Sequence, residues 1–386
     1  MELALPAVRQ LPQHRKMEKV NRMRLKRLAM WMLVLVMVPA GGMASGSWFT
    51  VTEDLSAETL MLPNDEYTGT VTMTFLGDCT LGGEEKKAKN ALSFASRIAE
   101  NGMDFPFRGL KQLTEADDLT VANLEVVLSD RKLKKEKKEF NFIGPTAYTQ
   151  ILTDGGIECV TVANNHTHDY GEEGYADTKQ ALEEAGICWF GTDAPAVWRS
   201  DDGLMIGFLG VNYSLTGNRA KRYAEQAERL RDLGCAAVIT VMHAGTEYSY
   251  RPPDNYQAQI VDRAVKAGSC LVIGHHPHVL QGLVIKEGVP IVYSLGNCSF
   301  GGTTFAKDSD ALTVRAELRF EDGELREIAL TFYPICITSD RRHNNYSPCL
   351  LTGDDAERVL KKMQETTGTD PGERNPDGSA TTRIER

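Results

Sequence analysis

The chain has 386 residues, of which 42% are hydrophobic and 25% charged, and its formal net charge is −10. These proportions are ordinary for a soluble globular protein, and they exclude a disordered chain, a collagen-like chain and a membrane protein with several spans. The first 27 residues carry eight Lys and Arg against two Glu, a net charge of +6, so the rest of the chain carries −16. So acidic a body argues against a nucleic-acid-binding protein, which would need a basic face.

An uncharged apolar stretch over residues 28–38 follows this basic segment and continues through Pro39 to Ala44. A positive segment, an apolar stretch and small residues at Gly42 and Ala44 are typical of an export signal, either cleaved or retained as an anchor. Because positive charge stays on the cytoplasmic side, we expect residues 1–45 to leave the body outside the cytoplasm. The body is then either held at the cell membrane by one N-terminal anchor or secreted.

Residues 46–70 are polar and are expected to form a linker. From residue 71 short apolar runs alternate with amphipathic segments. We expect strands over 71–76, 119–124, 158–163, 204–211, 236–242 and 270–273, and helices over 89–100, 145–154, 173–185, 220–233 and 255–267. Strands that alternate with helices at this spacing predict a layered α/β domain with largely parallel strands.

After residue 278 the pattern predicts only strands, over 279–285, 291–295, 311–320 and 325–332, with the last two joined as a hairpin. The main domain is expected to cover residues 71–350. A helix is expected over 354–364, and the tail from Thr366, rich in Gly, Pro, Thr and charge, is expected to be disordered.

A lysine-rich run, RKLKKEKKE, occupies residues 131–139. Such a run favours a solvated loop, and the alternative is contact with an anionic polymer or a lipid headgroup.

Eight cysteines are spread along the chain without a CxxC pair. Most lie in apolar, strand-like runs, which favours buried small hydrophobic side chains. A bridge between Cys336 and Cys349 is the alternative for one pair.

Six of the eight histidines fall in three short stretches at the ends of predicted strands: NNHTHD (164–169), MHAG (242–245) and GHHPH (274–278). The C-terminal ends of parallel strands are where α/β sheets carry their sites. Imidazole is a common transition-metal ligand, and His276 and His278, two apart in an extended segment, can face the same way. The pattern indicates a metal or catalytic site.

Carboxylates and amides occupy the other strand ends, with Asp78 at the first strand and Asn123 and Glu125 at the second. Together with the imidazoles they form a mixed nitrogen and oxygen donor set. This set suits Mn, Zn or Fe, as one or two ions, better than Ca or Mg.

Seven motifs occur in order: GDCTLGG (77–83), ANLEVVLS (122–129), ANNHTHDYGEEG (163–174), GTD (191–193), HAGTEY (243–248), GHHPHVLQG (274–282) and YSLGNCSF (293–300). Over about residues 71–334 the chain resembles the CapA family of poly-gamma-glutamate capsule biosynthesis proteins. That family is similar in turn to the calcineurin-like metallophosphoesterases. The resemblance implies a four-layer α/β/β/α sandwich with a metal site along the joined sheet edges.

The resemblance also implies roles for individual residues. The metal ligands would be Asp78, Glu125, Asn165, His243, His276 and His278, and His166 would act as general acid or transition-state stabiliser. Supporting or substrate-contacting roles fall to Asn123, Asp169, Glu247, His275 and Asn297. The sequence departs from the metallophosphoesterase pattern at Thr80, where a histidine is usual, and at Asn123 with Glu125, where an aspartate is usual.

Three functions remain open at this stage. The first is an exported, membrane-anchored protein that acts in making, releasing or exporting an anionic polymer of the poly-gamma-glutamate type through a metallophosphatase-like metal site, which would be a phosphoesterase-like or polyglutamate amide hydrolase if it is catalytic. The second is a non-enzymatic accessory that binds metal or polymer beside membrane synthase proteins. The third is a free-standing phosphoesterase acting on small substrates.

Overall fold

The computed structural model of the chain describes residues 46–51, 66–340 and 342–386. The expected export segment, residues 1–45, lies outside these ranges. Among the described residues, no helix is both long and apolar enough to cross a membrane.

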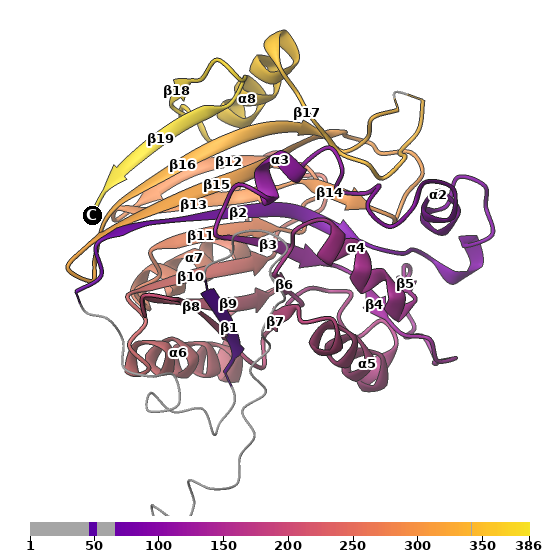
Figure 1. The fold of residues 1–386 in the computed structure, drawn as a ribbon, viewed down its shortest axis with the longest axis horizontal. Helices are drawn as coiled ribbons and strands as arrows, with labels where there is room; N and C mark the ends of the chain where they lie inside the picture. Colours follow the sequence, from indigo (N-terminus) through magenta and orange to yellow (C-terminus); the bar gives the residue numbers. More distant parts are fainter. Residues whose placement is uncertain (1–45, 52–65, 341) are drawn as a thin grey trace, which may run out of the picture. The chain divides into compact units, whose positions relative to one another are not determined.

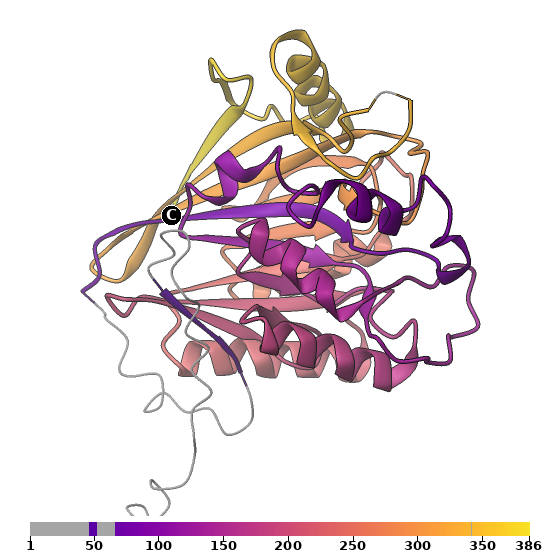
Figure 2. The same cartoon turned by 45° about the vertical axis from the view of Figure 1, so that its right-hand side comes forward.

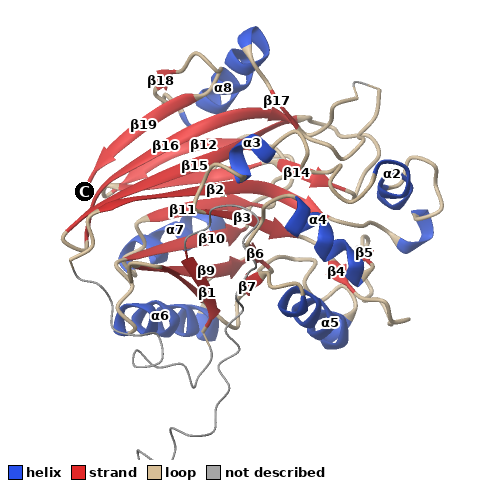
Figure 3. Ribbon diagram, viewed as in Figure 1, coloured by secondary structure: helices blue, strands red, loops and turns tan. Residues whose placement is uncertain are grey.

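Two large β-sheets dominate the fold (Figure 1, Figure 3). The first has the order β1-β8-β9-β10-β11-β13-β12, formed by β1 (Gly46–Thr50), β8 (Ala196–Ser200), β9 (Met205–Asn212), β10 (Ala237–His243), β11 (Leu271–His275), β13 (Val289–Leu295) and β12 (Leu280–Lys286). The second has the order β18-β19-β16-β15-β2-β3-β6-β7, formed by β18 (Glu373–Arg374), β19 (Ala380–Glu385), β16 (Glu324–Cys336), β15 (Asp310–Glu321), β2 (Gly69–Thr80), β3 (Leu119–Leu124), β6 (Cys159–Thr161) and β7 (Cys188–Phe190). Within it β14 (Asn297–Phe300) pairs with β2, and β17 (Cys349–Leu350) pairs with β16. A separate small ladder joins β4 (Val127–Leu128) to β5 (Ile143–Gly144).

Helices cover the outer faces of both sheets (Figure 2). Against the first sheet pack α6 (Gly217–Asp232) and α7 (Asn255–Lys266), and against the second pack α2 (Phe94–Asn101), α4 (Thr149–Asp154) and α5 (Gly171–Glu184). Between the sheets lies an apolar core to which both contribute, including Met73, Phe75, Ile206 and Phe208. The expected four-layer α/β/β/α sandwich is therefore confirmed.

Four further helical segments occur among the described residues. They are η1 (Glu85–Lys87), α3 (Lys111–Thr114), η2 (Thr146–Tyr148) and α8 (Gly353–Thr367). Through Val359, Leu360 and Met363, α8 joins the core between the sheets, where it packs on β12 and β16.

The expected helix over residues 89–100 is wrong in its first part, because α2 begins only at Phe94. Asn90 Oδ1 accepts a hydrogen bond from the Leu92 backbone N–H at 2.9 Å, and Ser93 Oγ accepts one from Ser96 N at 3.2 Å. These local bonds form a turn and an N-cap, which start the helix later than the apolar pattern indicates.

The prediction of a disordered tail is wrong. Residues 380–385 form β19, an antiparallel partner of β16, with Ala380 opposite Phe332 and Ile384 opposite Ile328. Ala380 and Ile384 are buried in the core between the sheets. The folded body therefore continues to the end of the chain.

The linker prediction is also wrong at its start, because Gly46–Thr50 forms β1. Trp48 pairs with Trp198 of β8, and its ring lies 5.1 Å from that of Phe208. Residues 52–65 of the expected linker lie outside the described ranges.

All eight cysteines are free thiols, and five of them are buried, as the apolar context predicts. Cys336 and Cys349 are register partners in β16 and β17 but are not bridged.

Candidate metal centre

The candidate site lies where the C-terminal ends of parallel strands from the two sheets meet. Asp78 is in β2, with Asn123 of β3 as its register partner on one side and Asn297 of β14 on the other. From the other sheet, His243 ends β10 opposite His275, which ends β11. The site therefore combines oxygen donors from one sheet with imidazoles from the other.

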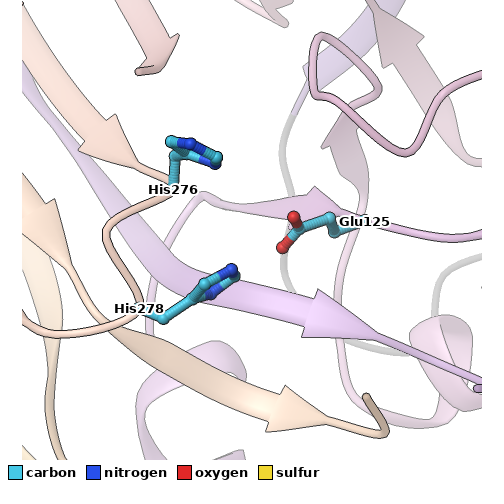
Figure 4. A group of neighbouring side chains, drawn as sticks. All are labelled: Glu125, His276 and His278. Carbon is cyan, nitrogen blue, oxygen red and sulfur yellow. The ribbon is translucent and has the colours of Figure 1, made fainter. Parts of the chain in front are cut away.

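Two sets of three side chains have ligand atoms close enough to share an ion. Glu125, His276 and His278 form one set, and Asp78, Glu125 and His243 form the other, with the ligand atoms of each within 4.8 Å of one another. In Figure 4 the Glu125 carboxylate, just after β3, and the two imidazoles, just after β11, point toward one another. Glu125 belongs to both sets, so its carboxylate could serve two adjacent metal positions.

The carboxylate of Glu125 is the strongest sign that a cation belongs here. Its side chain is fully buried, and neither oxygen has a hydrogen-bond partner among the described residues. Burial, and then the nearby Asp78 carboxylate, raise the pKa of Glu125 well above its usual range. A buried anion without donors is costly unless a cation compensates it. The orphaned carboxylate and the donors around it fit a divalent metal ion.

Hydrogen bonds hold the other donors in place. Asn123 Nδ2 donates to Asp78 Oδ1 at 2.7 Å and lies 3.1 Å from His243 Nδ1. His243 Nε2 lies 2.8 Å from Asn165 Oδ1 and 3.0 Å from His276 Nδ1. In the absence of an ion, one nitrogen in each of these nitrogen–nitrogen contacts must donate a hydrogen to the other. The short contacts also bring His243 Nε2, His276 Nδ1 and Asn165 Oδ1 close enough together to face a shared metal.

His243 and His276 favour the neutral form that binds metals, whereas for His278 burial opposes protonation but the nearby Glu125 and Asp78 carboxylates raise the pKa to about 9. Burial lowers the pKa of His243, with a further contribution from His276, and burial lowers the pKa of His276 to about 4. For Asp78, burial opposes ionisation, but hydrogen bonds from His275 and His278 hold its pKa well below its usual range. The site thus presents the ionised Asp78 carboxylate beside the neutral imidazoles of His243 and His276, and His278 would release its proton on binding a metal.

The backbone at His276 and His278 is strained. His276 has φ of 96° and His278 has φ of 57°, on either side of Pro277. Residues other than glycine in the left-handed region cluster at functional sites, where surrounding structure enforces the conformation.

His166 occupies a different place from the metal candidates. Its Nδ1 lies 2.7 Å from Asp169 Oδ2, and its Nε2 lies 3.8 Å from Glu125 Oε1. The ring of Phe142 stacks on its imidazole at 4.3 Å between ring centres. This arrangement presents Nε2 to the centre while the buried Asp169 carboxylate fixes the opposite nitrogen.

Two of the remaining predicted residues are near the centre and one is not. His275 Nδ1 lies 3.2 Å from Asp78 Oδ1, and Asn297 Oδ1 lies 2.9 Å from His278 Nδ1. Glu247 has an exposed side chain and forms no hydrogen bond or ion pair in the part of the chain that the structure describes. It acts on the site only through the longer-range effect of its negative charge on the histidines.

Sequence reasoning missed Asn164 and Lys138. Asn164 Nδ2 donates to Asn123 Oδ1 at 3.1 Å, and its Oδ1 accepts from the backbone N–H of His166 at 3.0 Å. Its place beside Asn165 in the NNH motif was the available signal. Lys138 pairs with Asp169 and donates to the Asn165 carbonyl at 2.8 Å, and its position in a charge run gave no indication of this role.

Two cavities lie beside the centre without including its metal candidates. The larger, about 490 Å³, is lined by Gly82 to Glu85, Ser129 to Leu133, Tyr148, Tyr170 and Gly301 to Thr304, among others. The second, about 390 Å³, opens between α5 and α6 and is lined by Asn164, His168, Asn212, Arg219 and Arg222, among others. Burial and donor chemistry, rather than cavity size, mark the candidate metal centre.

Comparison with known proteins gives one family and several relatives. Residues 72–301 match the family model described as bacterial capsule synthesis protein PGA_cap. The chain is 28% identical over 266 residues to the capsule biosynthesis protein CapA of Bacillus anthracis, a match covering 62% of each chain. It is 28% identical over 261 residues to the PGA biosynthesis protein CapA of Bacillus subtilis, covering 61% of this chain and 65% of the relative. The chain thus matches a little under two thirds of the length of these relatives.

Among solved structures, the calcineurin-like phosphoesterase YfkN from Bacillus subtilis is similar with a TM-score of 0.39 and 13% identity, covering 78% of this chain and 98% of that one.

Proposed function

Because the chain belongs to the bacterial capsule synthesis protein PGA_cap family, we propose that it acts in the synthesis, release or export of an anionic capsule polymer of the poly-gamma-glutamate type. The names of the two CapA relatives support a role with such a polymer. We place the activity at the buried centre around Glu125. The observation that carries this assignment is the fully buried carboxylate, without a hydrogen-bond partner, beside the neutral imidazoles of His243 and His276.

Six residues would hold the ion or ions: Asp78, Glu125, Asn165, His243, His276 and His278. Their mixed nitrogen and oxygen donors suit Mn, Zn or Fe. A divalent ion bound there would supply Lewis-acid chemistry for hydrolysis of a phosphoester or of a polyglutamate amide bond.

The protein's own contribution to hydrolysis centres on His166. Asp169 holds Nδ1, so Nε2 is the atom left to deliver or hold a proton on the side of Glu125. Stacking on Phe142 fixes the ring plane and keeps water from that face. A positioned general acid of this kind contributes on the order of a hundredfold or more in rate.

A second candidate, a non-enzymatic accessory that binds metal or polymer beside membrane synthase proteins, is favoured by Thr80. Metallophosphoesterases usually carry a histidine at this position. Here the Thr80 hydroxyl donates to the backbone carbonyl of Glu125 at 3.2 Å, so it supports the loop that carries Glu125. One ligand of an ordinary two-metal site is therefore replaced by a structural group.

The test uses purified protein loaded in turn with Mn, Zn and Fe. We expect bound metal in stoichiometric amount and turnover of a phosphoester or of poly-gamma-glutamate. His166→Ala should lose about a hundredfold in rate at unchanged metal content, and replacing His276 and His278 together with Ala should remove the metal. Stoichiometric metal without turnover on either substrate would favour the accessory function, and unchanged metal in the double variant would refute the centre.

A further inference from the structure

A basic loop runs between β4 and β5 at the edge of the centre (Figure 1). We define the basic loop as residues 131–139, with the sequence RKLKKEKKE. It holds six cationic side chains and two glutamates, and all of its residues except Leu133 are exposed.

The basic loop is fastened at its first residue. The Arg131 guanidinium binds Asp177 of α5 through two hydrogen bonds, of 2.7 and 2.8 Å, and Ser129 Oγ donates to the same carboxylate at 2.5 Å. Paired bonds from a guanidinium to a carboxylate fix orientation as well as distance. This end of the loop is therefore held on the outer helix.

The other end is fastened to the centre itself. The backbone N–H of Glu136 donates to the Asp169 carbonyl at 2.8 Å. Lys138 donates to the Asn165 carbonyl at 2.8 Å and forms an ion pair with the buried Asp169 carboxylate, which holds His166. This end of the loop therefore contacts Asn165 and Asp169, and the Asp169 carboxylate is the group that orients His166.

Between these two anchors lie four lysines without an anionic partner. Lys132, Lys134, Lys135 and Lys137 are exposed, and none forms an ion pair or hydrogen bond within the described residues. The chain beyond residue 27 carries −16, so this concentration of unpaired positive charge opposes the sign of the body. Clustered like charges repel one another, and an anion with several charges relieves that repulsion.

The geometry leaves room beside the loop. Its first residues, with Ser129 and Asp130, form one wall of the cavity of about 490 Å³. A bound chain could therefore follow the lysines at the surface and have space at their side.

We propose that the basic loop is the docking surface for the anionic polymer chain, and that Arg131 and Lys138 hold it so that a bound chain lies beside His166. This inference rests on the proposed function, since it names the surface through which the same centre receives its polymer. The ion pair between Lys138 and Asp169 holds the positive charge of the loop beside the proposed reaction site rather than on a distant face of the molecule. This position favours a polymer over a lipid headgroup as the bound anion.

The experiment measures binding of fluorescently labelled poly-gamma-glutamate to the full chain by anisotropy, at low and at raised salt. The test variant replaces Lys132, Lys134, Lys135 and Lys137 with Ala. The matched control makes the same change in charge at exposed cationic residues on outer helices, by replacing Lys221, Arg263, Lys266 and Lys361 with Ala. We expect the loop variant to lose at least tenfold in affinity and most of the salt dependence, and the control to stay within about twofold of the unchanged protein.

Equal affinity of the loop variant and the unchanged protein would overturn the inference, provided that the unchanged protein binds the polymer. Absence of polymer binding by the unchanged protein would count against the proposed function itself. Vesicles with phosphatidylserine give the remaining arm: if the loop variant loses vesicle binding but keeps polymer binding, the loop serves a membrane surface and the inference is wrong. Unchanged metal content and thermal unfolding of the loop variant show that the centre and fold are intact.

Discussion

Glu125 has a buried carboxylate whose negative charge a bound cation would compensate. Its carboxylate is fully buried near Asp78, and neither oxygen accepts a hydrogen bond from the described residues, although His243 Nε2 lies 3.4 Å from Oε1. In the metal-free protein this group either takes up a proton or stays as a buried anion without a hydrogen-bond donor, and both states cost stability. A metal ion would make the same group a ligand shared by two sets of donors.

Glu125→Gln should therefore change metal affinity and stability in opposite directions. The variant keeps the shape of the side chain but loses the charge, so we expect it to bind metal at least tenfold more weakly. The metal-free variant should be more stable than the metal-free unchanged protein by about 1–3 kcal/mol, because an unpaired buried carboxylate is gone. Metal analysis after dialysis and urea unfolding in the presence of a chelator measure the two effects.

Glu172→Gln is the matched control, since its side chain is 88% exposed. We expect it to alter neither quantity by more than about 0.5 kcal/mol. A Glu125→Gln protein that retains full metal would refute the role of Glu125 as a ligand.

The sequence predicts such residues only where their motifs follow strands. Asp78, His243 and His276 each follow an apolar run, so the rule that sites lie at the C-terminal ends of parallel strands finds them. Lys138 lies 28 positions before His166 in a run with no periodicity, and only the folded loop brings it to the centre. Long-range contacts of this kind leave no local pattern to detect.

At the scale of elements, a half-buried carboxylate links β3 to β6 at the end away from the centre. Glu158, just before β6, accepts a hydrogen bond from the backbone N–H of Thr120 in β3 at 2.7 Å. Burial raises the pKa of Glu158 to about 8, and the nearby Asp117 carboxylate adds to the shift. We therefore expect this strand junction to be sensitive to pH.

We expect the stability of the protein to fall as pH rises from about 4.5 to 8. The carboxyl of Glu158 ionises near pH 4.5 when unfolded and near 8 when folded, so the folded state holds the extra proton in this window. Proton linkage then lowers the free energy of unfolding by up to about 1.4 kcal/mol per pH unit for this group.

Glu158→Gln isolates the contribution, because the amide oxygen still accepts from Thr120 but cannot ionise. The variant should match the unchanged protein near pH 4.5 and become the more stable of the two by pH 8, in urea unfolding at several pH values. Parallel pH profiles for the two proteins would contradict the assignment.

Strands and helices with strong periodicity were predictable, and those that depend on a distant partner were not. The β3 segment, Leu119–Leu124, has the bounds that its apolar run predicts. In contrast, the β19 segment has only two apolar residues, Ala380 and Ile384, and it lies in a tail rich in polar residues. Its strand conformation comes from pairing with β16, and tertiary pairing of this kind overrides composition.

On the scale of the whole molecule, the order of strands in the sheets could not be predicted from the sequence. β2 lies between β3, its parallel neighbour, and β15, which follows more than 200 residues later and pairs with it antiparallel. Both neighbours were predicted as strands, but nothing local specifies that they share a partner. The four-layer arrangement came from the resemblance to a family rather than from periodicity.

The distribution of charge along the chain leads to a prediction of location. Residues 1–27 carry +6 and precede an apolar stretch, while the remainder carries −16. Positive residues beside an apolar segment stay in the cytoplasm, so the acidic body should cross the membrane. That location would place the centre and the basic loop on the side where a capsule polymer accumulates.

Reporter fusions after Arg386 test this location, since β19 ends one residue earlier, at Glu385, and the marked C-terminus lies at the end of that strand (Figure 1). We expect a phosphatase that is active only outside the cytoplasm to be active in the fusion, and a galactosidase that is active only inside to be inactive. Removal of residues 1–45 should reverse both results, because the body alone lacks the positive and apolar segments that direct export. An active galactosidase fusion to the full chain would show that the body lies in the cytoplasm. Any action on the polymer would then take place there and not at the cell surface.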